Sequence, residues 1–68
     1  MLNASHLAAA LRCMFPRQRQ AAILVWVDGL SVREAARRMG VHHSTVSELL
    51  EGARRRALDV IDEVEQTP

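Results

Sequence analysis

Apolar residues recur three and four positions apart along most of the chain, which is the spacing of the buried face of an amphipathic helix. Nowhere do apolar and polar residues alternate cleanly between turn residues, as they do in a half-buried strand. Leu7, Leu11 and either Met14 or Phe15 indicate a first helix. Pro16 should end this helix, because the residue before a proline is pushed out of helical conformation, and it suits the first turn of a second helix. The pattern therefore predicts an all-α chain.

The ends of the predicted helices carry capping residues. Asn3 or Ser5 suits the N-cap of the first helix, and Gly29 suits the left-handed stop of the second. Ser31, with Glu34 three residues later, forms a capping box that starts a third helix. On the second helix we expect four residues to face the core: Ala22, Ile23, Trp26 and Val27.

The stretch Ser31–Leu50 has the pattern of a helix-turn-helix. Two helices that meet steeply need a small residue at their closest approach and a glycine in the turn, where φ is positive. Ala36 and Gly40 meet these needs, and Val46 supplies the inward apolar residue of the second helix. The remaining inward positions are Ala35, Met39, Val41 and Leu49. We therefore predict a small helix-turn-helix bundle of about four helices, whose long C-terminal helix begins near His42.

The net charge of +1 hides a strong asymmetry. All nine basic residues are arginines, and they lie between Arg12 and Arg56. Up to Ala57 they outnumber four acidic residues, whereas residues 58–68 contain four acids and no base. A basic body with an acidic tail favours an anionic partner for the body, although arginines also solvate helical surfaces.

A series of motifs extends from Phe15 to Leu58. They are Pro16–Arg19, Gly29–Ser31, Glu34–Ala36, Gly40–Val41, Ser44–Val46 and Ala53–Arg56. In this order they resemble region 4 of the sigma-70 family and the related DNA-binding domain of response regulators. The resemblance implies a helix-turn-helix fold and DNA binding. One departure is His42, which stands where these families usually have Ser or Thr.

The recognition helix of a helix-turn-helix places its N-terminal residues in the major groove. Candidates for base reading are therefore the outward residues His42, His43, Ser44, Ser47 and Glu48. Candidates for phosphate contacts are Ser31, Arg33, Arg37, Arg38, Thr45, Arg54 and Arg55. Two alternatives stay open at this point. Each histidine can instead cap the helix, and Arg54–Arg56 can be a solvated face that balances the acidic tail.

The fourth helix shows no stop signal before about Val64. Its apolar residues alternate spacings of four and three, as a heptad seam does: Val46, Leu50, Ala53, Ala57, Val60 and Val64. The seam can pack against the first helix through Leu7 and Leu11, or a second copy of the chain can cover it. We expect the second, with residues 53–65 as a dimerisation helix and Gly52 as a bend before it. The expected interface residues are Ala57, Val60, Ile61 and Val64.

No motif of catalysis or metal binding is present in the sequence. His42 and His43 are adjacent, and His6 and Cys13 lie far from them, so the spacing of a metal site is missing. No aspartate is placed to complete a Ser–His nucleophile, and no apolar run approaches the roughly 18 residues of a membrane span. We expect no enzyme activity, no cofactor, no metal, no small-molecule ligand and no membrane association.

These expectations combine into one function and one alternative. The 68 residues make a single domain, residues 1–68, with a helix-turn-helix core at residues 31–51. We expect a cytoplasmic, nucleoid-associated prokaryotic regulator that binds double-stranded DNA as a homodimer and represses transcription by occupying a palindromic operator. The alternative is an interaction module that contacts RNA polymerase or a sigma factor, with DNA binding secondary.

Overall fold

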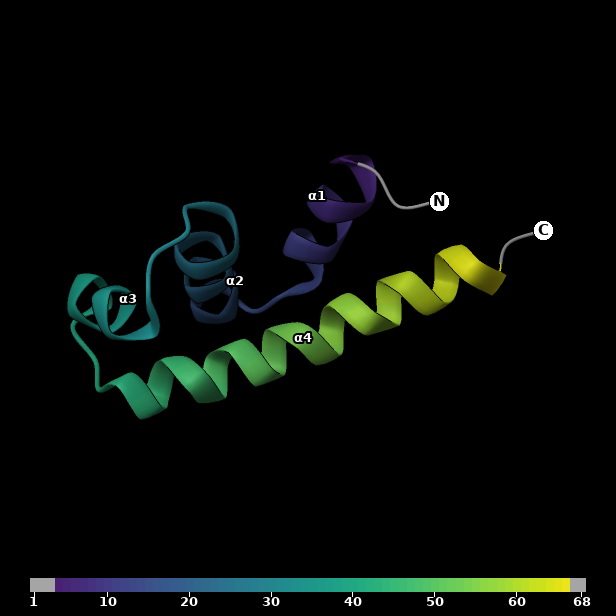
Figure 1. The fold of residues 1–68 in the computed structure, drawn as a ribbon. Coiled ribbons are helices and arrows are strands. Elements are labelled where there is room, and N and C mark those ends of the chain that lie inside the picture. The colour runs from purple at the N-terminus through teal and green to yellow at the C-terminus, as the bar shows by residue number, and fades with distance from the viewer. Residues whose placement is uncertain (1–3, 67–68) are drawn as a thin grey trace.

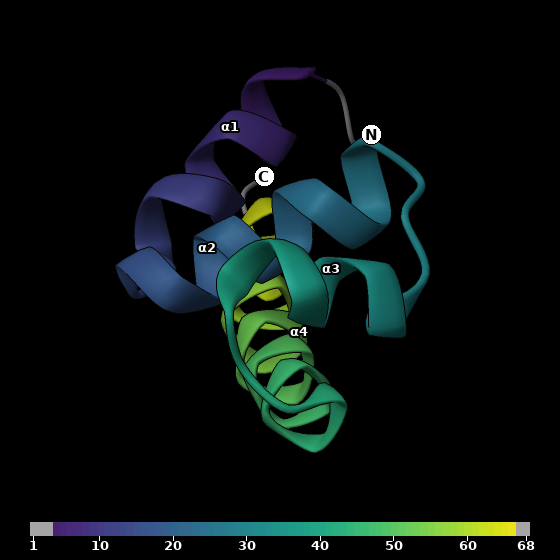
Figure 2. The ribbon, with the colours of Figure 1, turned by 90° about the vertical axis from the view of Figure 1, so that its left-hand side faces the viewer.

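The computed structural model describes the chain from residue 4 to residue 66, and its side chains up to residue 62. Over this range the chain is all-α, as predicted. Its elements are α1 (Ala4–Cys13), α2 (Pro16–Ala22), a π-helical turn η1 (Ile23–Val27), α3 (Val32–Met39) and α4 (His43–Gln66). α3, α2 and α1 lie in succession along the long α4, starting from its N-terminal end (Figure 1). Seen nearly along the axis of α4, the three shorter helices cover one of its sides (Figure 2).

The core lies between α4 and the shorter helices, and it consists of two clusters of mostly small side chains. Ala10, Met14, Ala22, Ala53 and Val60 form the cluster beneath α1, and Ala21, Ala35, Ala36 and Val46 form the one beneath α3. Six of these nine buried residues are alanines, whose side chains let neighbouring helix backbones approach closely. The helix-turn-helix core predicted from Ala36 and Val46 is confirmed, with exposed fractions of 4% and 0%.

The buried face of α1 differs from the prediction. Met14 is buried, whereas Phe15 and Leu7 are more than half exposed. α1 packs instead through Ala10, with Leu11 beside it, because small side chains allow α1 to lie close against α4. The proposed capping residue Ser5 lies inside the first turn of α1 and is not its N-cap, and the alternative Asn3 lies outside the described residues.

The second predicted helix changes form after α2. The backbone N–H of Asp28 donates to the carbonyl of Ile23 at 2.8 Å, a step of five residues that defines a π-helical turn. This wider turn alters the direction of the residues within it relative to an α-helix. Trp26 is 47% exposed and Val27 is 55% exposed, so the prediction that both face the core is wrong. Ile23 is half-buried, and the alanines of α2 fill the inner face.

The seam of α4 is covered in part by the chain itself. Val60 is 8% exposed and lies in the cluster beneath α1, and Ala57 packs against the same cluster. For these two positions the seam is therefore covered by α1 of the same chain, and not by a second copy as expected. Ile61 is half-buried and Leu58 is 46% exposed, so both remain accessible to a partner. Val64 falls outside the side chains that the structure describes.

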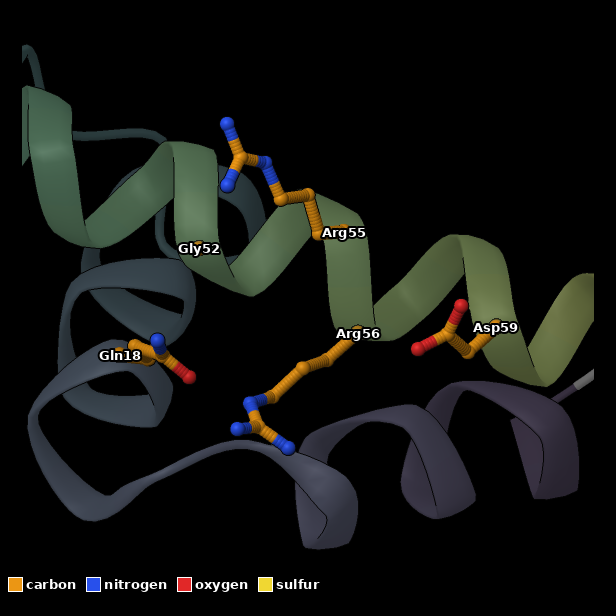
Figure 3. A pocket seen from close by; sticks show the side chains of 5 residues that line it. All are labelled: Gln18, Gly52, Arg55, Arg56 and Asp59. Carbon is orange, nitrogen blue, oxygen red and sulfur yellow. The ribbon is translucent and has the colours of Figure 1, made fainter.

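Gly52 does not interrupt α4, which is one continuous helix from His43 to Gln66. It lies opposite Gln18 of α2, as Figure 3 shows. A Cβ atom at Gly52 would overlap Nε2 of Gln18. The Oε1 atom of Gln18 accepts a hydrogen bond from the N–H of Phe15 at 3.1 Å and so caps the start of α2. The glycine therefore permits a close contact that holds this cap in place.

We predict that the effect of Gly52→Ala on stability depends on Gln18. In a Gln18→Ala background the substitution should stabilise by about 1 kcal/mol, the helix-propensity difference between glycine and alanine. In the wild type, the displaced Gln18 loses its cap hydrogen bond, worth about 0.5–1.5 kcal/mol, so the net change should be near zero. The measurement is the free energy of unfolding in urea, followed by helical circular dichroism.

Gly40→Ala provides the control for this cycle. Gly40 has a φ of +69° and open space around its Cβ position, so alanine should cost about 1–2 kcal/mol through the backbone alone. That loss should be the same with or without Gln18. An equal effect of Gly52→Ala in both backgrounds would contradict the proposed contact.

Candidate nucleic-acid interface

The start of α3 is fixed by a cap at Ser31. Its Oγ atom accepts a hydrogen bond from the backbone N–H of Glu34 at 3.1 Å, as the capping box predicts. The Ser31 hydroxyl also donates to Oε1 of Glu34 at 3.2 Å. Gly29, with a φ of +79°, turns the chain into this cap. The Ser31 side chain predicted to contact phosphate is exposed, but it is already engaged with a carboxylate.

The turn between α3 and α4 is a Schellman motif. Gly40 adopts a φ of +69°, its N–H donates to the carbonyl of Arg37, and the N–H of Val41 donates to the carbonyl of Ala36 at 3.0 Å. These bonds satisfy carbonyls that the end of α3 would leave unpaired. The turn thereby sets the angle at which α4 leaves α3. Val46 of α4 packs against Ala35 and Ala36 of α3 in the core, and this contact holds the two helices at that angle.

His42 caps the N-terminus of α4. Its Nδ1 atom accepts a hydrogen bond from the backbone N–H of Ser44 at 3.2 Å, and the hydroxyl of Ser44 lies 2.8 Å from the same nitrogen. Here a histidine fills the position where related domains usually carry Ser or Thr, and it performs the capping role of those residues. The ring of His42 remains exposed beside the helix start.

The first two turns of α4 present polar side chains outward. Ser44, Ser47 and Glu48 are exposed, and Thr45 is half-buried. Val46 lies on the opposite, buried side. Three of the residues predicted to read bases, Ser44, Ser47 and Glu48, are therefore exposed at the N-terminal end of the longest helix.

Three arginines lie on the preceding helix, α3. Arg33, Arg37 and Arg38 are exposed, and within the described part of the chain none of them pairs with a carboxylate. Arg33 and Arg37 line a hollow of about 210 Å³ between α3 and α4. The other lining residues are Ala36, Val41, His42 and His43.

His43 is half-buried at the edge of this hollow, with its ring centroid 4.2 Å from that of His42. Desolvation lowers the pKa of His43 below its ordinary value of 6.5, and electrostatic interaction with Arg33 and then His42 lowers it further. These surroundings therefore favour the neutral form of His43.

Arg54 and Arg55 lie farther along α4, away from the hollow. Both approach Glu51, with N–O distances of 3.8 Å and 3.7 Å, in exposed ion pairs. Such pairs contribute little to stability, about 0–1 kcal/mol, and leave both arginines accessible. The phosphate contacts predicted for Arg54 and Arg55 stay a prediction. The ion pairs agree with the alternative interpretation of the sequence, in which these arginines form a solvated face of the helix.

Two further arginines have a role in the fold that the sequence analysis missed. Arg19 donates from Nε to the carbonyl of Leu11 at 2.8 Å and from Nη2 to that of Met14 at 3.1 Å. Arg56 donates from Nη1 to the carbonyl of Cys13 at 3.4 Å. Both therefore cap the C-terminus of α1, where cations are favoured. The available signal was Pro16, which ends α1 and so leaves carbonyls in its last turn without their usual helical partners, within reach of an arginine one turn into α2.

A second hollow, of about 300 Å³, lies between α2 and α4. Figure 3 shows Arg56 reaching from α4 toward the link between α1 and α2, where its guanidinium stacks 3.8 Å from the centroid of the Phe15 ring. Arg55 points away from that link, and Asp59 borders the hollow farther along α4. The lining therefore mixes a carboxylate with arginines that already have partners.

Within residues 4–62, no group of three or more His, Cys, Asp or Glu side chains is placed to hold a metal ion. Among the described helices, none is long and apolar enough to cross a bilayer. Neither finding identifies a partner for the surface at the start of α4.

Comparison with known proteins places the chain in a family. No curated protein and no solved structure matches it. The family model described as "Response regulator PhyR, sigma-like domain" matches residues 11–57, which include α2, η1, α3 and the first half of α4. This agrees with the resemblance to sigma-factor domains found in the sequence. Because the match spans most of its residues, the chain belongs to the family of sigma-like domains of the response regulator PhyR, and it is a sigma-factor-related regulatory domain.

Proposed function

We propose that the protein regulates transcription by binding double-stranded DNA through the first two turns of α4. One observation carries the proposal. Arg33 and Arg37 of α3 share a hollow with His42 and His43 at the start of α4, and the exposed Ser44, Ser47 and Glu48 follow these histidines along the helix. Neither arginine has a carboxylate partner among residues 4–62. An α-helix fits the major groove, where serine and glutamate side chains can pair with base edges, while arginines flanking it neutralise backbone phosphates.

The charge along α4 limits how much of the helix faces DNA. Among the described residues beyond Glu48, the exposed charged side chains of α4 are Glu51, Asp59 and Asp62 as well as Arg54 and Arg55, and both arginines pair with Glu51. Three carboxylates against two arginines give that part of the helix no net attraction for phosphates. The proposed interface therefore comprises α3, the turn and the first two turns of α4, with Glu48 as an acceptor for cytosine N4 at its edge.

We further propose that the regulator acts as a homodimeric repressor on a palindromic operator. Among the side chains described in the C-terminal half of α4, the large apolar residues that remain accessible are Leu58 and Ile61. Ser47 and Ile61 are 14 residues apart, or about 21 Å along the helix. A two-fold axis near Ile61, with the helices crossing at an angle, would separate the two reading segments by about 34 Å, one turn of DNA.

The second candidate function is contact with RNA polymerase or a sigma factor. It is favoured by the large apolar side chains that the fold leaves exposed, namely Phe15, Trp26 and Val27. Aromatic residues of this kind are enriched at protein interfaces. Capture of polymerase or sigma factor by a chain without measurable duplex affinity would favour this candidate over the first.

We predict that Arg33→Ala weakens binding to specific and nonspecific duplexes alike. Loss of one phosphate contact should reduce the slope of log affinity against log salt by about one ion. The measurement is fluorescence anisotropy of a labelled duplex over a series of salt concentrations. Arg12→Ala, which removes an exposed arginine from α1, is the control and should leave the slope unchanged. An Arg33→Ala slope equal to the wild-type slope would place the phosphate contacts elsewhere.

Selection of bound duplexes from a random pool tests whether the start of α4 recognises base sequence. We predict that the wild type enriches a two-fold symmetric motif. Ser47→Ala should lose preference at one or two positions of each half-site, at a cost of about 1–3 kcal/mol on the selected sequence. Its loss should be sequence-specific, unlike that of Arg33→Ala. If the variant enriches the full wild-type motif, Ser47 does not read bases.

For the dimer, we predict that Ile61→Asp and Leu58→Asp yield helical monomers that bind the selected palindrome much more weakly. Both side chains are accessible, so a charge there should disturb the pairing and spare the fold. Val60→Asp is unsuitable, because Val60 is buried against α1. Val27→Asp, at an exposed apolar position outside α4, is the control and should remain dimeric in analytical ultracentrifugation. Sedimentation of the wild type as a monomer at micromolar concentration would contradict the proposed dimer.

A further inference from the structure

The hollow between α3 and α4 has the composition of an anion site. Arg33 and Arg37 enter it from α3, and His42 and His43 enter it from the turn and the start of α4. Its remaining lining residues, Ala36 and Val41, are apolar, and no carboxylate lines it. Guanidinium and imidazole groups donate hydrogen bonds in directions that suit phosphate oxygens.

The size of the hollow suits one such group. A water molecule occupies about 30 Å³ in the liquid, so about 210 Å³ has room for a phosphate of five heavy atoms. The second hollow differs in its chemistry. It is lined by Asp59, and its Arg55 is already paired with Glu51, so it offers an anion no comparable preference.

We propose that the hollow between α3 and α4 binds one phosphate oxyanion, supplied in function by the DNA backbone, and that His43 takes up a proton when the phosphate enters. DNA binding then strengthens as the pH falls. This inference rests on the proposed function of α4, and it gives His43 a phosphate contact in place of the base contact expected from the sequence.

The proton uptake follows from the charged and titratable groups that face His43. These are Arg33 and Arg37 from α3 and His42 from the turn, and in the free protein the pKa of His43 lies below 6.5. A phosphate in the hollow places a negative charge beside the ring and offsets the repulsion from Arg33. The charged imidazolium, which donates from both ring nitrogens, is then favoured.

The sign of the pH effect is fixed by this change. Because the pKa of His43 is higher in the complex than in the free protein, the complex binds an additional proton from solvent. Affinity therefore rises as the pH falls through the region between the two pKa values. The limit for uptake of one proton is a tenfold gain per pH unit, or about 1.4 kcal/mol.

The test is a pH titration of the histidine ring resonances of the full chain by NMR, carried out under three conditions at equal ionic strength. These are sodium chloride alone, inorganic phosphate, and a short DNA duplex. We expect the pKa of His43 to rise with the duplex and, to a smaller extent, with inorganic phosphate. His6 of α1 is the internal control, and its titration should not change.

Two variants assign the effect to the hollow. Arg33→Gln should raise the pKa of His43 in chloride and reduce its rise on adding the duplex, whereas the charge-matched Arg12→Gln should change neither. His43→Gln should flatten the pH dependence of duplex affinity. Retention of the wild-type pH dependence by His43→Gln would overturn the role of this histidine.

The outcomes separate this inference from the proposed function. If the duplex binds with salt-dependent affinity and the pKa of His43 does not move, the phosphate site is overturned and DNA binding stands. If the duplex does not bind, the proposed function fails. The titration in inorganic phosphate then decides whether the hollow binds an oxyanion. A raised pKa of His43 in phosphate would then support the oxyanion site, and an unchanged pKa would overturn it.

Discussion

The insertion of Val46 among the methyl groups of Ala21, Ala35 and Ala36 is the contact on which the arrangement of this protein depends. Val46 is the largest side chain that the described structure buries completely, and its neighbours come from α2 and α3. Alanines allow the three helices to approach closely, and a valine fixes how far they approach. Because Val46 lies in the first turn of α4, this packing also turns Ser44 and Ser47 outward. Burial of one apolar residue thus determines which polar residues are available to a partner.

A second constraint is the division of the arginines between the fold and the surface. Arg19 and Arg56 close the C-terminus of α1 through its carbonyls, so α1 can end abruptly before Pro16 and turn back along α4. Arg33 and Arg37 of α3 have no such partners among the described residues, and they line the hollow beside the helix-turn-helix. Arg54 and Arg55, farther along α4, pair with Glu51 instead. Arg33 and Arg37 therefore form a local group of positive charge beside the start of α4.

Much of this could be predicted from the sequence, because local rules and packing agree in the helix-turn-helix. Ser31 as the cap of α3, Gly40 as the turn residue and Val46 as the inward residue of α4 follow from local rules, and the structure gives them these roles. The run of seven apolar residues Ala21–Val27 was ambiguous, since a helix cannot bury every side. The π-helical turn that exposes Trp26 depends on how closely α2 approaches its neighbours, which the spacing of apolar residues does not encode. The capping arginines and the hollow at His43 also arise only from tertiary contacts, so the sequence could name their residues but not their geometry.

The most direct test of the central claim is a map of backbone amide shifts in the ¹⁵N-labelled protein during titration with duplex DNA. Binding through the helix-turn-helix predicts salt-sensitive shifts within residues 31–48, while α1 and residues 55–62 of α4 stay unperturbed. Shifts confined to the surroundings of Phe15 and Trp26, or no shifts at all at low salt, would contradict the claim that the start of α4 is the DNA-binding surface.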